Sequence, residues 1–200
     1  MKPSCEWVAL DFETATSSRG SACSVGLVYV RDGRIEAAET CLMRPPGNVY
    51  SGFNIRIHGI TPAMTEGEPS FGELWPALEA RIAGRPVVAH NAAFDMSVLR
   101  HELDRIGCAY PDLEYYCTVV LSRAAWPHLC DHKLPTVASH CGITFHHHDA
   151  AEDARACAEI LLKLCAESGA AVHPEAVAGR HGVRPGRLCA AGYDACSGRW

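Results

Sequence analysis

The first third of the chain carries apolar runs that predict three strands close together in sequence. The run from Trp7 to Leu10 is wholly apolar and suits a strand covered on both faces of a sheet. Residues 22–30 are rich in Val, Leu and Tyr, and Asp32-Gly33 follows them, a dipeptide that favours a tight hairpin. Residues 34–42 alternate moderately and form the returning strand. The pattern therefore predicts an antiparallel meander.

Further along, short apolar strands alternate with helical periodicity. Residues 43–58 hold several prolines and glycines and are predicted to be a loop, while residues 86–91 and 115–119 predict two more strands. Thr61-Pro62 is typical of a helix start. Apolar residues at helical spacing predict one helix from 71 to near Gly84 and a second that follows the strand at 86–91 and stops at Gly107. Further helices are predicted over 121–126, 134–141 and 154–164. The expected architecture is a mixed α/β fold built on five strands.

After Gly169 this pattern gives way to Gly, Pro and Arg, so we divide the chain into one domain, 1–168, and a C-terminal tail, 169–200. Two hundred residues suit a single domain with a substantial core. The net charge of −5 argues against a protein that coats nucleic acid by electrostatics alone. No apolar run is long enough to span a membrane, and the N-terminus leaves no room for a signal peptide, so we expect a cytoplasmic protein.

The eleven cysteines are scattered, odd in number and without a C-x-x-C pair. Several lie inside apolar runs, which favours reduced thiols that pack as small hydrophobic groups. A zinc site can be drawn from Cys130, His132, His140 and Cys141, but its spacing matches no standard pattern.

Carboxylates follow the strands and precede the helices in three separate segments. Asp11 and Glu13 stand two apart after the first strand, so both would point to the same face. Asp95 lies near a helix start, and Asp153 lies about one turn into another helix with His148 just ahead of it. Solvated loop positions would also explain the first pair, and capping alone would explain Asp95.

Four carboxylates and a histidine, if they meet, form the ligand set for two hard divalent cations and a general base. Oxygen ligands favour Mg²⁺ or Mn²⁺ over zinc. Two such ions can clamp the attacking and leaving oxygens of a phosphodiester while the histidine accepts the proton of a water molecule.

The three segments resemble the three signature motifs of the DEDDh, or DnaQ-like, exonuclease family. Asp11-Phe12-Glu13-Thr14 is similar to D-x-E-T, Asn91 to Asp95 to N-x-x-x-D, and His148 with Asp153 to H-x-x-x-x-D. His58-Gly59-Ile60 is similar to the H-G-I segment of the family. The resemblance covers roughly residues 6–168 and is especially close to stand-alone bacterial relatives of the proofreading (epsilon) subunit of DNA polymerase III.

This resemblance implies an RNase H-like fold with a mixed five-stranded sheet, three antiparallel strands followed by two parallel ones. It implies hydrolysis of single-stranded 3′ ends, with DNA favoured, to nucleoside 5′-monophosphates. Asp11, Glu13, Asp95 and Asp153 would hold two Mg²⁺ or Mn²⁺ ions, and His148 would be the general base. The substrate contacts that it implies are Thr14, His58, Ile60, Asn91 and Phe94. The family often has a glycine two residues after the motif threonine, and Thr16 stands there in this chain.

Two other functions stay open at this point. The same chemistry could act on RNA, as in the RNase T and oligoribonuclease branches, because the 2′-hydroxyl is read by a few pocket contacts. A catalytically silent module that binds nucleic-acid ends or a polymerase would have no reason to keep all five residues. A polymerase or a second copy of the chain remains an open partner. The tail arginines, Arg180, Arg184, Arg187 and Arg199, either touch phosphates or keep the end soluble.

Three histidines stand in a row before the last motif aspartate, His146, His147 and His148. Consecutive residues point in different directions and rarely chelate one ion. The spacing to Asp153 selects His148 as the base, and His146 and His147 are then loop or packing residues.

Overall fold

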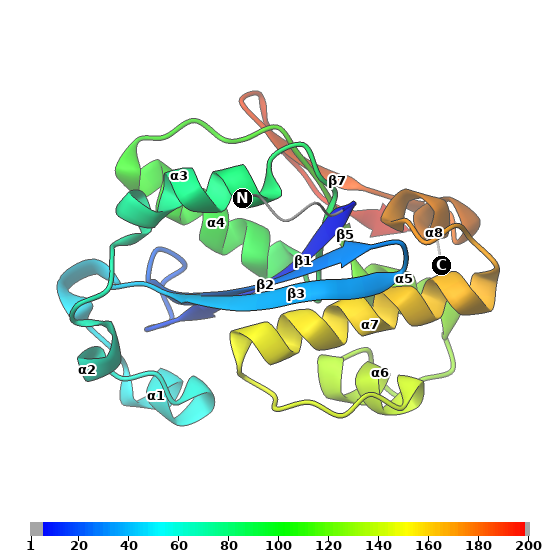
Figure 1. Cartoon of the computed structure of the whole chain (residues 1–200), viewed down its shortest axis with the longest axis horizontal. Coiled ribbons are helices and arrows are strands. Elements are labelled where there is room, and N and C mark those ends of the chain that lie inside the picture. Colours follow the sequence, from blue (N-terminus) through cyan, green and yellow to red (C-terminus); the bar gives the residue numbers. More distant parts are fainter. Residues whose placement is uncertain (1–5, 199–200) are drawn as a thin grey trace.

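In the computed structural model, which describes residues 6–198, one mixed sheet runs through the molecule in the order β3-β2-β1-β4-β5-β7-β8 (Figure 1). The strands β1, β2 and β3 are antiparallel, whereas β4 and β5 continue the sheet parallel to β1. Their bounds are β1 (Trp7–Thr14), β2 (Ala22–Arg31), β3 (Arg34–Leu42), β4 (Val87–Ala89), β5 (Leu113–Cys117), β7 (Gly186–Cys189) and β8 (Gly192–Asp194). The predicted five-stranded mixed sheet is confirmed, and a C-terminal hairpin extends it.

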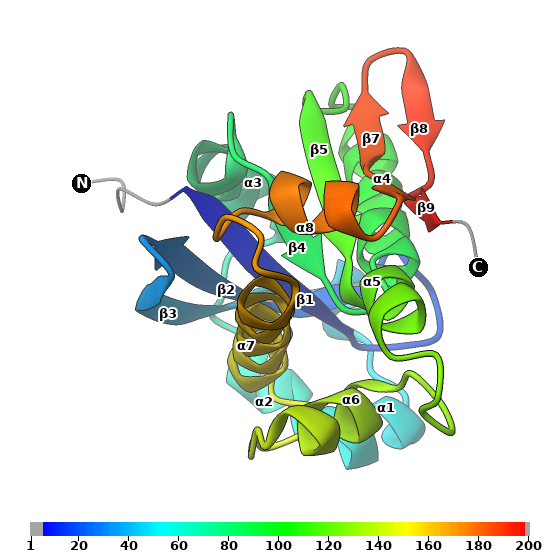
Figure 2. The same cartoon turned by 90° about the vertical axis from the view of Figure 1, so that its right-hand side faces the viewer.

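Helices cover both faces of the sheet (Figures 1 and 2). On one face lie α3 (Phe71–Ile82) and α4 (Ala93–Ile106), which supply apolar side chains to one buried cluster. On the other face, a second buried cluster takes its side chains from α5 (Thr118–Ala125), α6 (Leu134–Cys141), α7 (Ala150–Ser168) and α8 (Pro174–Arg180). The sheet is therefore the middle layer of three, as its continuous apolar strands require.

The first strand shares its side chains between the two layers. Val8, Leu10 and Phe12 point into the cluster of α3 and α4, while Trp7 and Ala9 point into the cluster of α7. Since side chains alternate along a strand, Asp11 and Glu13 continue the α7 side. This places both carboxylates beside the start of α7.

The start of α7 crosses β2 in very close contact. Gly26 pairs with Asp11 across the two strands, and a Cβ atom on Gly26 would lie 2.0 Å from the carbonyl oxygen of Ala150. Only glycine leaves room for backbone at this distance. The contact brings the first turn of α7, and with it Asp153, over the end of β1.

Residues 43–58, predicted to be a loop, are partly helical. A short 3₁₀ turn, η1 (Pro46–Asn48), precedes α1 (Gly52–His58), and α2 (Pro62–Thr65) follows. Ser51 caps α1 by accepting from the N–H of Asn54, and Gly59 ends it in a left-handed conformation. The prediction was wrong because α1 buries no side chain in the core, so it has no apolar periodicity, and its residues Phe53 and Ile57 are exposed.

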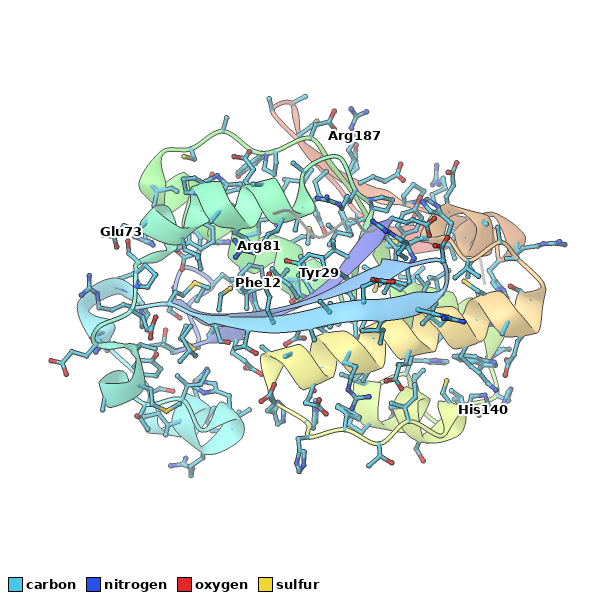
Figure 3. All side chains as sticks on the ribbon, viewed as in Figure 1. Phe12, Tyr29, Glu73, Arg81, His140 and Arg187 are labelled. Carbon is cyan, nitrogen blue, oxygen red and sulfur yellow. The ribbon has the colours of Figure 1, made fainter. Side chains whose placement is uncertain are left out.

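The tail is ordered into elements where the sequence pattern indicated none. Besides α8 and the hairpin of β7 and β8, it forms a two-stranded sheet of β6 (Val183–Arg184) and β9 (Ser197–Gly198). The Tyr115 hydroxyl donates to the Asp194 carbonyl at 3.0 Å and accepts from the Cys196 N–H at 3.2 Å. Arg187, labelled in Figure 3, contacts Asp112 at 3.0 Å, and Arg199 lies outside the described residues. The domain boundary near residue 168 stays a prediction.

Polar contacts also tie α3 to the far edge of the sheet. Arg81 on α3 donates to the Glu39 carboxylate on β3 at 2.8 Å, and the Tyr29 hydroxyl donates to the same carboxylate (Figure 3). The pair bridges two elements that are distant in sequence. Since both side chains are partly exposed, it contributes little net stability.

The cysteines and the membrane expectation can be checked on residues 6–198. The ten cysteines in this range are all free thiols, and Cys5 lies outside it. The potential zinc ligands are engaged elsewhere: His132 Nδ1 lies 3.0 Å from the Ser122 hydroxyl, and His140 packs edge-on against Trp126. Within the same range, there is no helix whose length and apolarity would let it cross a membrane.

Candidate active site

Carboxylates from three distant segments meet at the end of β1. Oxygen atoms of Asp11, Glu13 and Asp153 all lie within 4.8 Å of one another. Asp95 joins them from the first turn of α4, where its Oδ1 accepts a hydrogen bond from the Phe12 N–H at 3.0 Å. The four carboxylates expected from the motifs are therefore assembled around one point.

The backbone around Asp95 explains its position. The strand β4 runs parallel to β1 and ends at the same edge of the sheet, one residue before His90. Asn91 then adopts a left-handed conformation with φ of 62°, which asparagine tolerates better than most residues. The chain turns sharply there into α4, and the Asp95 side chain is directed back at β1.

Burial and mutual repulsion make these carboxyl groups poor acids in the absence of a cation. Burial, together with the negative charges of Asp153 and Asp95, raises the pKa of Glu13 to about 8. Burial also raises the pKa of Asp95 to about 7, opposed by the Phe12 N–H bond. The pKa of Asp11 is raised well above its ordinary value by burial, then by Asp95 and Asp153. The cluster therefore carries unfavourable charge that a cation would relieve.

The residues fit divalent cations. Asp95 Oδ2 is buried and has no hydrogen-bond partner among residues 6–198, so one oxygen in the site lacks the donor that a buried carboxylate requires. All four donors are carboxylate oxygens, which favour hard cations such as Mg²⁺ or Mn²⁺. The cluster could thus hold the metal ions that its sequence motifs imply.

Two histidines lie beside Asp153 in different ways. His147 Nδ1 is 3.1 Å from Asp153 Oδ2, whereas His148 reaches the same oxygen through its backbone N–H, also at 3.1 Å. The two rings stack with centroids 3.8 Å apart. His148 has a φ of 71°, which turns the chain into α7 and leaves its ring without a hydrogen bond in the described part of the chain. The structure places both imidazoles at the cluster. Among residues 6–198, His146 forms hydrogen bonds through its backbone alone: its N–H donates to Glu152 at 3.5 Å and its carbonyl accepts from the Asp149 N–H at 3.3 Å.

A pocket of about 320 Å³ opens at the carboxylates. Four of the five expected substrate contacts, Thr14, His58, Asn91 and Phe94, line it. Ile60, the fifth, is buried in a small apolar cluster with Ala15 and Cys23. We call this space the nucleoside pocket, after the terminal nucleotide that the sequence motifs imply as its ligand; its volume suits a small ligand and its wall mixes apolar and polar groups.

The wall of the nucleoside pocket is fixed by hydrogen bonds to the Thr14 carbonyl. Asn54 Nδ2 donates to that oxygen at 2.7 Å, and His58 Nε2 lies 3.2 Å from it. The Ile60 N–H donates to His58 Nδ1 at 3.0 Å, so the proton of the ring sits on Nε2 and points at Thr14. These bonds hold α1 against the end of β1.

The sequence analysis missed two residues at the site, His90 and Asn54. His90 lines the nucleoside pocket and lies partly buried between the Thr118 hydroxyl, 2.8 Å from Nδ1, and the His132 carbonyl, 3.0 Å from Nε2. A polar side chain directly after an apolar strand was the available signal for His90. Asn54 carried no such signal, because it lies in the segment predicted to be a loop.

Comparison with known proteins adds a family to this geometry. Residues 8–161 match the family model of RNase T, described as exonuclease. The chain is 33% identical over 159 residues to a PolC-type DNA polymerase III of Clostridium perfringens, and 30% identical over 162 residues to that of Caldanaerobacter subterraneus. The matches cover 78% and 80% of this chain but only 11% of each relative, so the chain corresponds to a small part of those polymerases.

Solved structures show the same arrangement of elements. Exonuclease X in complex with 5′ overhanging duplex DNA superposes with a TM-score of 0.71 at 26% identity, over 88% of this chain and 99% of that one. The nuclease domain of 3′hExo, a DEDDh family member bound to rAMP, gives a TM-score of 0.70 at 16% identity, over 84% of this chain and 95% of that one. The RNase H-like exonuclease fold expected from the motifs is confirmed.

Proposed function

The chain belongs to the RNase T exonuclease family, and on that premise we propose that it hydrolyses single-stranded DNA from the 3′ end to nucleoside 5′-monophosphates. The main support is the convergence of four carboxylates at the mouth of the nucleoside pocket. An end-directed nuclease needs such a site, because the pocket binds one terminal nucleoside while the carboxylates hold the cations beside the adjacent phosphate.

In this proposal Asp11, Glu13, Asp95 and Asp153 hold two divalent cations, which when bound polarise the scissile phosphate and stabilise the developing charge. His148 accepts the proton of the attacking water, since its ring nitrogens have no partner among residues 6–198. Burial lowers the pKa of His148, so the ring is neutral near pH 7 and able to accept that proton. The water oxygen bonds to phosphorus, and the 3′-oxygen of the penultimate nucleotide leaves.

The protein side chains around the pocket orient the terminal nucleoside. Phe94 is half-buried at the start of α4 and offers a flat apolar surface to a sugar or base. Arg19 lies over the ring of Phe94, with its guanidinium carbon 4.0 Å from the ring centroid, and this contact fixes the ring. Thr14, His58 and Asn91 supply the polar part of the wall.

The choice of DNA follows the relatives, which are DNA polymerases and a DNA-bound exonuclease. The ribonucleotide bound to 3′hExo keeps RNA as the second candidate substrate. A polymerase partner is proposed on the PolC relatives alone. The cytoplasm is the compartment we propose, because ten free thiols suit a reducing environment.

The test is incubation of matched 5′-labelled single-stranded DNA and RNA with the protein and Mg²⁺, followed by separation of the products. We expect a ladder that shortens one nucleotide at a time from the 3′ end, faster on DNA. Asp95→Asn should give no ladder, and full activity in excess EDTA would contradict the two-metal proposal. A faster ladder on RNA would transfer the proposal to the RNA branch.

A further inference from the structure

A second pocket opens on the other side of the same carboxylates. It has a volume of about 520 Å³ and shares Asp11, Asp153, His90, Asn91 and His147 with the nucleoside pocket. The two pockets therefore form one groove with the carboxylates in the middle. We call the part beyond the carboxylates the upstream groove.

The upstream groove carries two exposed cations, Arg123 on α5 and Lys133 just before α6. Neither forms an ion pair with any residue of the 6–198 range, whereas Arg81, Arg105 and Arg155 are each paired with a glutamate. Hydrogen bonds from Thr136 and from the Lys133 N–H lower the pKa of the nearby Asp131 carboxyl, and the charge of Lys133 helps to lower it, but the Lys133 and Asp131 side chains form no ion pair in that range. Unpaired cations beside a site for a phosphodiester are positioned for further phosphate groups.

The wall that presents Lys133 is held in place from the sheet. His90 Nε2 donates to the His132 carbonyl at 3.0 Å. Burial lowers the pKa of His90 to about 4, so the ring is neutral at physiological pH and keeps this hydrogen bond. His132 Nδ1 lies 3.0 Å from the Ser122 hydroxyl. Asp131 also lines the groove, where its Oδ1 accepts the Lys133 N–H at 3.0 Å. The cations therefore stand on a preorganised wall.

A substrate bound as proposed above must continue past the carboxylates. The nucleoside on the 3′ side of the scissile phosphate occupies the nucleoside pocket, so the penultimate nucleotide lies on the opposite side. Val119 and Pro135 give the upstream groove an apolar surface for its sugar and base. The groove therefore offers both apolar and cationic side chains, as a site for single-stranded nucleic acid requires.

We propose that the upstream groove binds the penultimate nucleotide of single-stranded DNA, and that Arg123 and Lys133 bind the phosphates upstream of the scissile bond. This inference rests on the proposed function. It predicts that both residues act on substrates with a nucleotide upstream of the cleaved phosphate. On a substrate that ends at that phosphate, the two cations have nothing to bind.

The experiment compares two substrates in Mg²⁺ for the wild type, Arg123→Gln, Lys133→Gln and the double variant. One substrate is a short oligothymidylate, and the other is the p-nitrophenyl ester of thymidine 5′-monophosphate, which lacks any upstream nucleotide. The quantity measured is kcat/KM for the oligothymidylate divided by kcat/KM for the ester. We expect the double variant to lower this ratio about tenfold. Each lost phosphate contact should also reduce the slope of log kcat/KM against log salt concentration by about 0.7 for the oligonucleotide.

Arg34→Gln is the matched control, because Arg34 is an exposed cation with no ion pair to any described residue. It stands opposite Arg31 in the β2–β3 hairpin, at the other end of the strands from Asp11. It should leave the ratio unchanged. An unchanged ratio in the double variant, or an equal fall in Arg34→Gln, would overturn the upstream groove while leaving the nuclease proposal intact. A wild type that cleaves neither substrate would overturn the proposed function and the inference with it.

Discussion

Among single residues, the adjacent histidines at the site make the sharpest test. His148→Ala removes the proposed base, so single-turnover cleavage under saturating Mn²⁺ should fall by about 10² to 10⁴-fold. His146→Ala should stay near wild type, because only its backbone contacts a neighbour. His147→Ala should also stay near wild type, since its ring is bound to Asp153, which a bound metal would occupy instead.

The outcome decides which imidazole serves the third motif. If His147→Ala is inactive and His148→Ala is active, the spacing of four residues has selected the wrong histidine. The two rings stack with centroids 3.8 Å apart, so substitution of each histidine in turn is the measurement that separates their roles.

Asp11 offers a second test, in which activity and stability should move in opposite directions. Asp11→Asn removes a ligand and should abolish turnover. It also removes one charge from a cluster in which burial and Asp95 raise the pKa of Asp11, so the metal-free protein should melt at a higher temperature than the wild type. Thermal unfolding in EDTA measures this. A variant that is inactive and melts lower would show that Asp11 supports the fold.

The site residues that the sequence could predict are those whose identity is set by chemistry and short spacing. The motif carboxylates belong to this group, and the structure brings all four together. Asn54, Arg123 and Lys133 could not be predicted, since each reaches the site through contacts between segments far apart in sequence. Ile60 was assigned to substrate from the motif, yet it is buried behind the pocket wall.

At the scale of elements, the crossing of α7 over β2 depends on one glycine. Gly26→Ala would place a Cβ atom 2.0 Å from the Ala150 carbonyl oxygen, so α7 must shift. We expect a loss of about 3 kcal/mol in the free energy of unfolding and a Tm lower by roughly 6–12 °C. Activity should fall as well, because the shift carries Asp153 away from Asp11.

Gly67→Ala is the matched control, since a Cβ atom there would meet nothing within 4 Å. Calorimetry and the cleavage assay on both variants test the idea. A Gly26→Ala protein with wild-type stability would mean that the two elements are farther apart in solution.

Elements with a buried apolar face could be predicted from the sequence, and those without one could not. The helix α6 begins and ends where the pattern predicted, because Leu134, Val137 and Ala138 face the core. The helix α1 was missed for the opposite reason, since it is held by its Ser51 cap and by Asn54 rather than by core packing. The tail strands are too short for alternation to be recognisable.

For the whole molecule, the carboxylate cluster predicts a dependence of stability on pH and metal. The pKa values of Asp95 and Glu13 are raised to about 7 and about 8, so their protons stabilise the folded state at low pH and are lost as pH rises. The metal-free protein should therefore lose roughly 4–8 °C in Tm between pH 6.5 and 8.5. Mg²⁺ or Mn²⁺ should restore much of this loss, because it binds the folded cluster alone.

The histidines titrate mainly below this window. Burial lowers the pKa of five of them, which are His58, His90, His132, His148 and His181. A lowered pKa makes stability rise with pH until the unfolded imidazoles have lost their protons, so these histidines oppose the decline near pH 6.5 and contribute little above about pH 7.5. Glu13→Gln should flatten the decline above that pH. A metal-free Tm that rises from pH 6.5 to 8.5, or that ignores millimolar Mn²⁺, would contradict the assembled cluster.

The wide separation of the carboxylates along the chain also fixes when the site can exist during synthesis. Asp11 emerges first, and Asp153 follows only after a further 142 residues (153 − 11), roughly 7–30 s later at ordinary translation rates. Until α7 is complete and lies across Gly26, the first carboxylates lack their partner. We therefore expect ribosome-bound chains that stop before residue 150 to leave single-stranded DNA intact, so that a growing chain of this nuclease is harmless until its last motif has been made.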